Sequence, residues 1–454
     1  MRSGTGSEGW AAPLVCAAGA GAIAGVAAFA GAWALRRKSA SSGAVARLPP
    51  TTVPPADDIA KAMLVRAGRA WPSLVGKTPL IRIACLSEET GCEILGKAEH
   101  LNPGGSPKDR VVFRAVCDAV ALGKLRPGGV VVEGTSGSTG ISLAALARCM
   151  GLRCEVFVQD DASGDKVAAL RRLGAAVTLV PSQSIVSPAH YVNQARRRGQ
   201  EPGCLFVDQF ETACNVRAHE EGTGREVLAA AERVHAFVMG AGTGGMLAGV
   251  SRTLKRHRGG RAEAAEPAGS GGVDAAERPS APPGLGDRLR AAVARSGVCV
   301  VLADPSGSAL FHRAQHGTAF AEEQSERTVR RHRYDTVVEG IGLDRVTSNL
   351  RRAVLDAAVR VSDAEAVAMS RRLAEHEGLF LGSTAAVHCE AARRVALALG
   401  PGHTVVTVLC DGGERHTTRF WSDDYLRDAG VLPATTESPG PECRTDGIGS
   451  ARHA

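Results

Sequence analysis

Short runs rich in β-branched residues alternate with longer helical patterns along most of this 454-residue chain. Val130–Val132 precedes a helix expected to begin near Thr139, and Glu155–Val158 precedes one expected near Asp165. Runs of the same kind follow at Ala176–Val180, Leu205–Val207, Ala236–Met239, Val298–Leu302 and Val405–Leu409. Short strands between helices of about 10–15 residues indicate βαβ units. The sequence therefore predicts an α/β protein with mostly parallel sheets, whose ligands would lie in loops at the carboxyl ends of strands.

Composition and charge narrow the class of protein further. Hydrophobic residues make up 44% of the chain and charged residues 22%, which is typical of a globular protein and excludes a disordered one. The net charge of +7 arises from 54 basic and 47 acidic residues, and no basic block is interleaved with aromatics. We therefore expect no nucleic-acid partner. Ser362 followed by Glu365 predicts a capping box that opens a helix over 363–375.

The N-terminal segment from Gly9 to Leu35 contains no charged residue. Its length suits a bilayer core of about 20 apolar residues, with Trp10 and Trp33 near the two interfaces. Arg36-Arg37-Lys38 follows and would stay on the cytoplasmic side, so we expect an uncleaved transmembrane anchor. The alternative is a cleavable signal peptide, since Ala28-Phe29-Ala30 resembles a small-residue cleavage site.

Low-complexity stretches divide the rest of the chain. We expect an anchor over 1–38, a flexible linker over 39–60, a catalytic domain over 61–429 and a disordered tail over 430–454. Within the catalytic domain we expect a smaller lobe at about 105–220 and a surface insertion at about 259–286.

Four loops after predicted strands carry residues suited to chemistry. Asn102–Arg110 presents Lys108 at the start of a helix, where it is either a solvated surface residue or an amine that forms a Schiff base. Gly134–Gly140 alternates hydroxyls with glycines, and Gly240–Met246 is rich in glycine. The first of these two is either an ordinary helix cap or a cradle for an anion, and the second is expected to be a further anion cradle that opens a helix. The fourth loop, Cys410–His416, is as consistent with a plain turn as with a functional site.

The glycine-rich loop at Gly240–Met246 does not match the common nucleotide-binding patterns. A reactive lysine together with two anion cradles instead suggests a cofactor that carries an aldehyde and a phosphate. Pyridoxal 5'-phosphate (PLP) fits this description, because one cradle would bind its phosphate and the other the substrate carboxylate.

These loops resemble a known family. Gly105–Arg110 resembles the Schiff-base lysine motif of the O-acetylserine sulfhydrylases (cysteine synthases), which have the tryptophan-synthase-β-like fold of fold-type-II PLP enzymes. Other segments match the family in order, namely Lys77–Leu80, Thr135–Gly140, Asp208–Glu211, Gly242–Gly245 and Glu339–Gly342. The resemblance runs from about Pro72 to Trp421 apart from the insertion, and implies two lobes with mostly parallel twisted sheets.

Finer details resemble the membrane-anchored fungal mitochondrial cysteine synthases. They are Ser184–Val186, Tyr191–Asn193, Glu339–Leu343 with Arg345–Thr347, and Arg415-His416 with Phe420-Trp421. This resemblance implies a homodimer anchored in the mitochondrial outer membrane by a single N-terminal helix, with its catalytic domain facing the cytosol.

The resemblance also implies roles for individual residues, and no metal site. Lys108 would hold PLP covalently and then act as the base that removes the substrate α-proton. Ser138 would lie near the 3′-oxygen of PLP, where most of the family has asparagine. The phosphate would be bound by Gly242, Thr243, Gly244 and Gly245, and the substrate carboxylate by Thr135, Ser136, Gly137, Thr139 and Gln209.

Two cofactor-binding positions depart from the family pattern. Met246 stands where the phosphate loop normally has threonine, so one hydroxyl donor is missing. Gly412 stands where a serine normally meets the pyridine nitrogen. Either this nitrogen has no side-chain partner, or Asp411 or Cys410 takes over that role.

The expected reaction is β-replacement, in which O-acetyl-L-serine and sulfide give L-cysteine and acetate. Related alternatives are a cystathionine β-synthase-like or a serine dehydratase-like enzyme. No Cys-Pro-His haem segment is present, and Pro107 precedes the lysine where dehydratases have phenylalanine. The two departures leave a further alternative, an anchored PLP-binding protein without catalytic activity.

Overall fold

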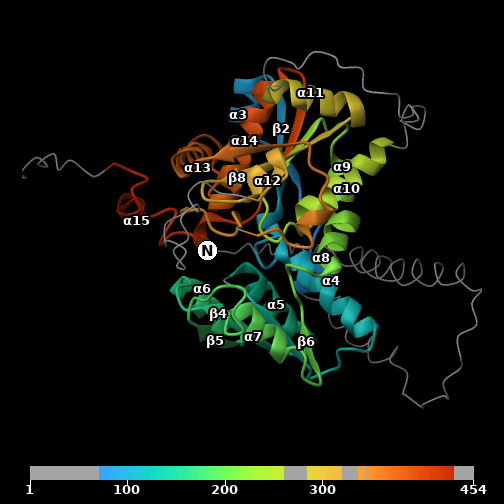
Figure 1. Ribbon diagram of the computed structural model, residues 1–454, viewed down its shortest axis with the longest axis vertical. Coiled ribbons are helices and arrows are strands. Elements are labelled where there is room, and N and C mark those ends of the chain that lie inside the picture. The colour runs from blue at the N-terminus through green and yellow to red at the C-terminus, as the bar shows by residue number, and fades with distance from the viewer. Residues whose placement is uncertain (1–70, 136, 260–283, 320–335, 344, 434–454) are drawn as a thin grey trace, which may run out of the picture. The chain divides into compact units, whose positions relative to one another are not determined.

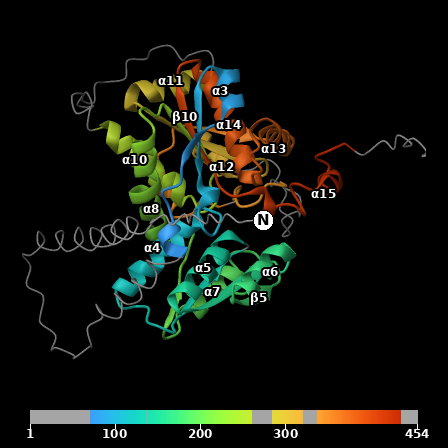
Figure 2. The ribbon, with the colours of Figure 1, turned by 180° about the vertical axis from the view of Figure 1, so that it is seen from behind.

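The computed structural model describes residues 71–135, 137–259, 284–319, 336–343 and 345–433 (Figures 1 and 2). The expected anchor, linker and C-terminal tail lie wholly or almost wholly outside these residues. Within the described ranges, no helix is both long and apolar enough to cross a membrane. The chain divides into two compact units, and each carries one sheet. The first unit is Met1–Thr78 with Leu101–Glu226, and the second is Pro79–His100 with Val227–Ala454.

The first unit contains a four-stranded parallel sheet with the order β5-β4-β3-β6. Its strands are β3 (Val130–Gly134), β4 (Arg153–Gln159), β5 (Ala176–Val180) and β6 (Cys204–Phe206). Its helices are η1 (Trp71–Leu74), α4 (Lys108–Ala121), α5 (Ser138–Met150), α6 (Gly164–Arg172), α7 (Tyr191–Arg198), α8 (Ala213–Ala218) and the π-helical η3 (His219–Thr223). The chain passes between the units at η2 (Glu99–Leu101) and α9 (Gly224–Ala230).

Successive residues of β3 point to opposite faces of this sheet, as strand geometry requires. Val131 belongs to a core cluster with Val116 of α4 and Leu143 of α5. Val130 and Val132 belong to a separate cluster with Ala195 of α7. Helices therefore cover both faces, which explains why this strand is apolar without alternation.

The second unit contains a six-stranded sheet with the order β1-β2-β10-β7-β8-β9. Only β1 (Leu80–Arg82) is antiparallel; it pairs with β2 (Glu93–Ala98). The parallel strands are β7 (Ala236–Met239), β8 (Cys299–Pro305), β9 (Ala357–Val361) and β10 (Thr404–Leu409). The helices are α3 (Ala84–Thr90), α10 (Gly245–Gly259), α11 (Leu285–Ser296), α12 (Leu310–His316), η5 (Leu350–Arg352), α13 (Asp363–Glu377), α14 (Ser383–Leu399), η6 (Gly413–Arg415) and α15 (Asp423–Asp428).

Two core clusters lie on the two faces of the six-stranded sheet. One joins Val238 and Val405 to α14, which is buried along most of its length. The other joins Phe237 and Val406 to Leu247 of α10. Figure 1 shows α14 and α10 on opposite sides of the sheet. Both units thus confirm the predicted α/β architecture of two lobes with mostly parallel sheets.

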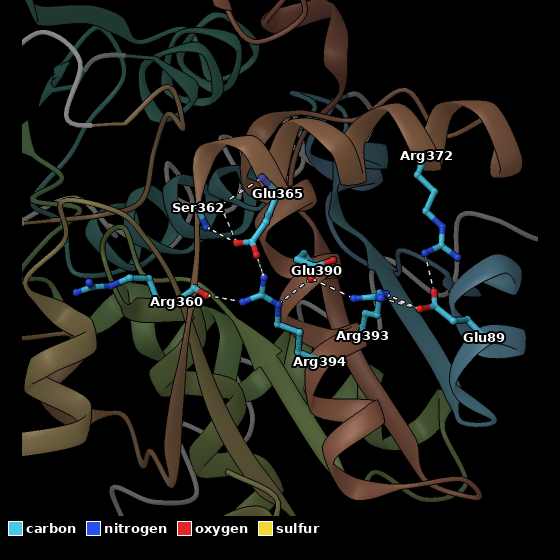
Figure 3. Close-up of polar contacts among 8 residues, drawn as sticks. All are labelled: Glu89, Arg360, Ser362, Glu365, Arg372, Glu390, Arg393 and Arg394. Atoms are coloured by element: carbon cyan, nitrogen blue, oxygen red, sulfur yellow. Dashed lines mark hydrogen bonds and ion pairs between the residues drawn. The ribbon is translucent and has the colours of Figure 1, made fainter. Parts of the chain in front are cut away.

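An ionic network links α3, α13 and α14 in the second unit (Figure 3). Glu89 of α3 accepts from Arg372 at 2.6 Å and from Arg393 at 2.8 Å. Arg394 donates to Glu390 at 2.8 Å and also pairs with Glu365, the capping-box residue of α13. The network therefore connects the start of α13 to α14, and α14 to α3.

Both ends of the expected insertion belong to helices. Gly259 is the last residue of α10, and α11 begins at Leu285. The intervening residues 260–283 lie outside the described part of the chain.

Candidate active site

Lys108 is the first residue of α4, in the first unit, and is half-buried. Its backbone N–H donates to Ser106 Oγ at 3.3 Å. The next residue, Asp109, is fully buried; it accepts from Gly104 N at 2.6 Å and from Ser142 Oγ of α5 at 2.5 Å. The turn that carries Lys108 is thus held to α5. Sequence reasoning assigned no role to Asp109, although it stands next to the lysine.

Arg110 holds a second segment against this turn. Its guanidinium binds both carboxylate oxygens of Glu226 at 2.7 Å and donates to Thr78 Oγ1 at 3.3 Å. The backbone N–H of Lys77 donates to the same Glu226 at 3.1 Å. The backbone of Lys77 has a φ of +52°, a left-handed conformation that is uncommon for any residue other than glycine. The Lys77-Thr78 segment singled out by the sequence is thus tied to the turn of Lys108.

The loop between β3 and α5 gathers the residues expected to bind a substrate carboxylate. Thr139 Oγ1 donates to Gln209 Oε1 at 2.5 Å, and Gln209 Nε2 donates to the Gly134 carbonyl at 3.2 Å. Gly137 N donates to Thr135 Oγ1 at 3.3 Å, and Ser138 begins α5. Ser136 lies outside the described residues. The described members of the predicted set are therefore close together, with backbone N–H groups at the start of a helix.

Glu133, which sequence reasoning missed, fixes both sides of this loop. Its side chain is fully buried and accepts from Gly134 N at 2.9 Å and from Gln209 N at 3.2 Å. Burial raises the pKa of Glu133 to about 8, against the opposing effect of these two hydrogen bonds. The available signal was an acidic residue at the end of an otherwise apolar strand.

The glycine-rich loop between β7 and α10 lies in the second unit. Gly244 has a φ of +77°, and a Cβ there would lie 2.6 Å from Leu350 Cβ. A Cβ on Gly242 would overlap the carbonyl oxygen of Gly340. Thr347 Oγ1, another residue without a predicted role, donates to the Thr243 carbonyl at 2.8 Å. The backbone is thus held without room for side chains and leads into α10 at Gly245, the arrangement that binds phosphate at a helix N-terminus.

The two departures from the family pattern also lie in the second unit. Met246 is buried in the core cluster that contains Leu247 and Phe237. Gly412 lies in an extended conformation, with φ −86° and ψ 158°, and forms a β-bridge with Leu381. Within that bridge region, Gly382 N donates to the Asp411 carbonyl at 2.9 Å.

The residues fit PLP on chemical grounds. The first unit supplies an amine at a helix start and a set of hydroxyl, amide and backbone donors suited to a carboxylate. The second unit supplies a close-packed glycine-rich loop, in which neighbouring atoms leave no room for a Cβ on Gly242 or Gly244. Its backbone N–H groups at the start of α10 suit a phosphate. These are the groups that a PLP enzyme acting on an amino acid requires.

Comparisons with known proteins agree with this chemistry. The family described as "Pyridoxal-phosphate dependent enzyme" matches residues 72–293 and 281–411. "Cysteine synthase 2" of Schizosaccharomyces pombe is 42% identical over 378 residues, covering 80% of this chain and 86% of the relative. The chain belongs to the cysteine synthase family of PLP-dependent enzymes. Two expectations are thereby confirmed, that the chain is an enzyme and that its cofactor is PLP.

One further relative and one solved structure add to this comparison. A Saccharomyces cerevisiae protein, named provisionally as a mitochondrial cysteine synthase, is 38% identical over 363 residues, covering 77% of this chain and 83% of the relative. The crystal structure of O-ureido-L-serine synthase is similar with a TM-score of 0.61 and 28% identity, covering 81% of this chain and 97% of that chain. The fold of this chain is thus shared with a solved structure over most of both chains.

Proposed function

We propose that the enzyme makes L-cysteine and acetate from O-acetyl-L-serine and sulfide. The observation that carries this proposal is identity of 42% to a cysteine synthase across 80% of the chain. The lysine at the start of α4 and the glycine-rich loop before α10 support it, because both fall where the family motifs place them.

The residues of the chain divide the work among them. Lys108 holds the cofactor, and its Nζ removes the α-proton and returns it after replacement. Thr135, Ser136, Gly137, Thr139 and Gln209 bind the substrate carboxylate and so orient Cα. Gly242 to Gly245 bind the cofactor phosphate through backbone N–H groups, and Ser138 and Gly412 line the cofactor. Met246 ends the phosphate loop through its backbone, since its side chain packs in the core. PLP, when bound, supplies the electron sink that makes the α-proton acidic. Acetate then leaves from Cβ, and sulfide forms the new bond there.

The test uses the purified protein with PLP and three substrate combinations. O-acetyl-L-serine with sulfide should give cysteine much faster than L-serine with homocysteine gives cystathionine, or L-serine alone gives pyruvate. Faster cystathionine or pyruvate formation would identify one of the alternative PLP enzymes. PLP binding without turnover of any combination would identify a non-catalytic binding protein.

We propose that residues 61–429 form the catalytic domain and that the segment between α10 and α11 is an insertion dispensable for cofactor binding. The composition of this segment, rich in Ala, Glu, Gly and Pro, supports the proposal. A longer surface loop costs only about 0.6 kcal/mol of closure entropy per doubling of its length. Replacing residues 260–283 by a Gly/Ser linker should leave the PLP dissociation constant unchanged, and loss of the folded state would refute the proposal.

We also propose that residues 1–38 anchor the enzyme in the mitochondrial outer membrane, with the catalytic domain in the cytosol. The charge-free stretch from Gly9 to Leu35, the basic residues after it and the name of the yeast relative support this. The full chain should remain in the membrane pellet after carbonate extraction, and protease should digest the catalytic domain in intact mitochondria. A chain lacking residues 1–55 should be released. Protection from protease would place the domain inside the organelle.

The enzyme is further proposed to be a homodimer, as its family resemblance implies. Light scattering on a chain lacking residues 1–55 should give about twice the monomer mass, and a monomer that makes cysteine would refute this.

A further inference from the structure

A buried histidine in the second unit lies between two carboxylates that come from separate segments. His416 follows η6 and is only 3% exposed. Its Nε2 lies 3.2 Å from Asp411 Oδ2, and its Nδ1 lies 3.1 Å from Glu339 Oε2. Arg419 Nη1 lies 3.0 Å from the other oxygen of Glu339. The cluster therefore balances two carboxylates with one guanidinium and one imidazole.

The geometry favours the charged imidazolium. His416 Nε2 forms a hydrogen bond to Asp411, and Nδ1 lies at ion-pair distance from the Glu339 carboxylate without an aligned hydrogen bond. Two carboxylates on opposite sides of the ring favour its protonated form. Burial alone would lower the pKa of His416, but the hydrogen bond and charge of Asp411 and the nearby carboxylate of Glu339 raise it to about 9. His416 is therefore positively charged at neutral pH, and the cluster is electrically neutral.

Each carboxylate belongs to a segment that leads to the cofactor-binding residues of this unit. Asp411 precedes Gly412, the position expected at the pyridine nitrogen, and its carbonyl accepts from Gly382 N at 2.9 Å. Glu339 precedes Gly340, whose carbonyl oxygen fills the space beside Gly242 of the phosphate loop. The imidazolium thus connects the Asp411-Gly412 segment to the segment that backs the phosphate loop.

The carboxylate of Asp411 points toward His416. Its Oδ2 meets His416 Nε2, and its Oδ1 occupies the space where a Cβ of Gly382 would lie. The first residues of α14 follow directly, so the carboxylate also lies near the positive end of a helix. The charge of Asp411 is thus paired with the imidazolium through Oδ2.

We propose that His416 is a positioning residue that holds the Asp411-Gly412 segment and the Glu339–Gly342 segment in one arrangement, and that Asp411 serves this clamp rather than the pyridine nitrogen. The proposal rests on the proposed function, because it assigns both segments to a PLP site. It predicts that cofactor affinity depends on the charge of His416, although the histidine itself does not touch the cofactor.

The test measures PLP binding to the apoprotein by equilibrium dialysis, which needs no turnover. The variants are His416→Gln, Asp411→Asn and the double variant. Each single variant should weaken PLP binding by about 3- to 10-fold. The double variant should bind PLP with the affinity of the more impaired single variant, since both changes remove the same contact. Wild-type affinity should fall as pH rises through about 9, where His416 loses its proton, and His416→Gln should lack this step.

Arg393→Gln is the matched control, because it removes a charge from the network of Figure 3 in the same unit without touching either segment. It should lower the melting temperature and leave the PLP dissociation constant and its pH dependence unchanged. If His416→Gln does not fold, Glu339→Gln and Asp411→Asn each remove one carboxylate and allow the same comparison.

The outcomes separate this inference from the proposed function. If the wild type binds no PLP, the proposed function fails first. If it binds PLP but the variants match it at every pH, or the two single effects add, the clamp is refuted. If Asp411→Asn alone shifts the visible absorption band of bound PLP, Asp411 acts on the cofactor ring and the assignment is overturned.

Discussion

Met246 and Gly412 depart from the family pattern for different physical reasons. The side chain of Met246 is part of the hydrophobic core, packed in the same cluster as Leu247 and Phe237, so this residue contributes to folding at the edge of the phosphate loop. Gly412 has no such packing role. Its φ of −86° is open to any residue, and the three atoms nearest to a Cβ there all belong to the end of the flexible, exposed Glu414 side chain.

Gly412→Ser should therefore be tolerated and should tighten PLP binding. Glu414 can rotate away, and the new hydroxyl regains the donor that the family places at the pyridine nitrogen. A neutral hydrogen bond contributes roughly 0.5–1.5 kcal/mol, so the PLP dissociation constant should fall about 2- to 10-fold. Titration of the apoprotein measures this, with Gly412→Ala as the control that adds a Cβ without a hydroxyl. Equal affinity of Ser and Ala variants would show that no donor is missing.

Met246→Thr should behave differently, because restoring the family hydroxyl here removes core packing. Replacing a buried methionine by a smaller, polar side chain should lower the free energy of unfolding by about 1–3 kcal/mol. Denaturant unfolding of the apoprotein measures this loss, and Met246→Leu, which nearly conserves volume, should lose less. If Met246→Thr is as stable as wild type, the side chain contributes nothing to the core.

At the scale of elements, the strands that were predicted share one property, a short apolar run without glycine or lysine, although their burial ranges from complete in β7 to largely exposed in β5. Ala176–Val180 and Ala236–Met239 were predicted with the bounds they have. The strands β1, β2 and β9 were not predicted. In β2 the run is interrupted by Gly96 and Lys97, and a Cβ on Gly96 would lie 2.9 Å from Leu409 of β10. That glycine is explained by a neighbouring strand more than 300 residues away in sequence, which local patterns do not reveal.

Local sequence patterns are limited in the same way for the candidate site. Lys108, Gln209 and the glycine-rich loops could be found because motifs mark them. Glu133 carries only a weak local signal, as an acidic residue that ends an apolar strand. Glu339 and His416 lie in segments that the sequence marked, but their pairing depends on partners brought together by folding. Sequence reasoning therefore located the groups expected to meet the ligands but missed most of the residues that hold those groups in place.

The capping box of α13 was predicted and is present, with Glu365 N donating to Ser362 Oγ at 3.4 Å and Ser362 N to Glu365 Oε2 at 2.8 Å. Ser362→Ala should lower the free energy of unfolding by about 1 kcal/mol, because an N–H of the first turn loses its acceptor. Chemical denaturation measures the loss, and Ser182→Ala, at an exposed serine, is the control. A loss no larger than that of the control would mean that the ionic network of Figure 3 holds the start of α13 without the serine.

At the scale of the whole molecule, three buried groups make stability depend on pH in the same direction. Burial raises the pKa of Glu133 to about 8 and that of Asp304 to about 7. The pKa of His416 is raised to about 9 despite its burial, by Asp411 and Glu339. Each group binds its proton more tightly in the folded state, so each favours folding at low pH and loses that contribution as pH rises through its folded pKa.

We therefore expect the melting temperature to fall as the pH rises from about 5 to about 9. Ion-paired carboxylates such as Glu89 and Glu365 have lowered pKa values, so their contribution to stability is lost only at more acidic pH. Glu133→Gln removes one of the three groups and should reduce the loss over this range by roughly 1–3 kcal/mol. Thermal unfolding of both proteins across the pH series measures the difference. Identical slopes would show that Glu133 is ionised in the folded protein throughout.

The central claim, a PLP-dependent cysteine synthase built on Lys108, is tested most directly by Lys108→Ala, with Lys124→Ala at an exposed lysine as the matched control. Both proteins are incubated with PLP, and the visible absorption band of lysine-bound cofactor and the rate of cysteine formation from O-acetyl-L-serine and sulfide are recorded. Lys108→Ala should lack the band and form no cysteine above the protein-free background, while Lys124→Ala should match the wild type. Cysteine formation by Lys108→Ala at a near-normal rate would contradict the account.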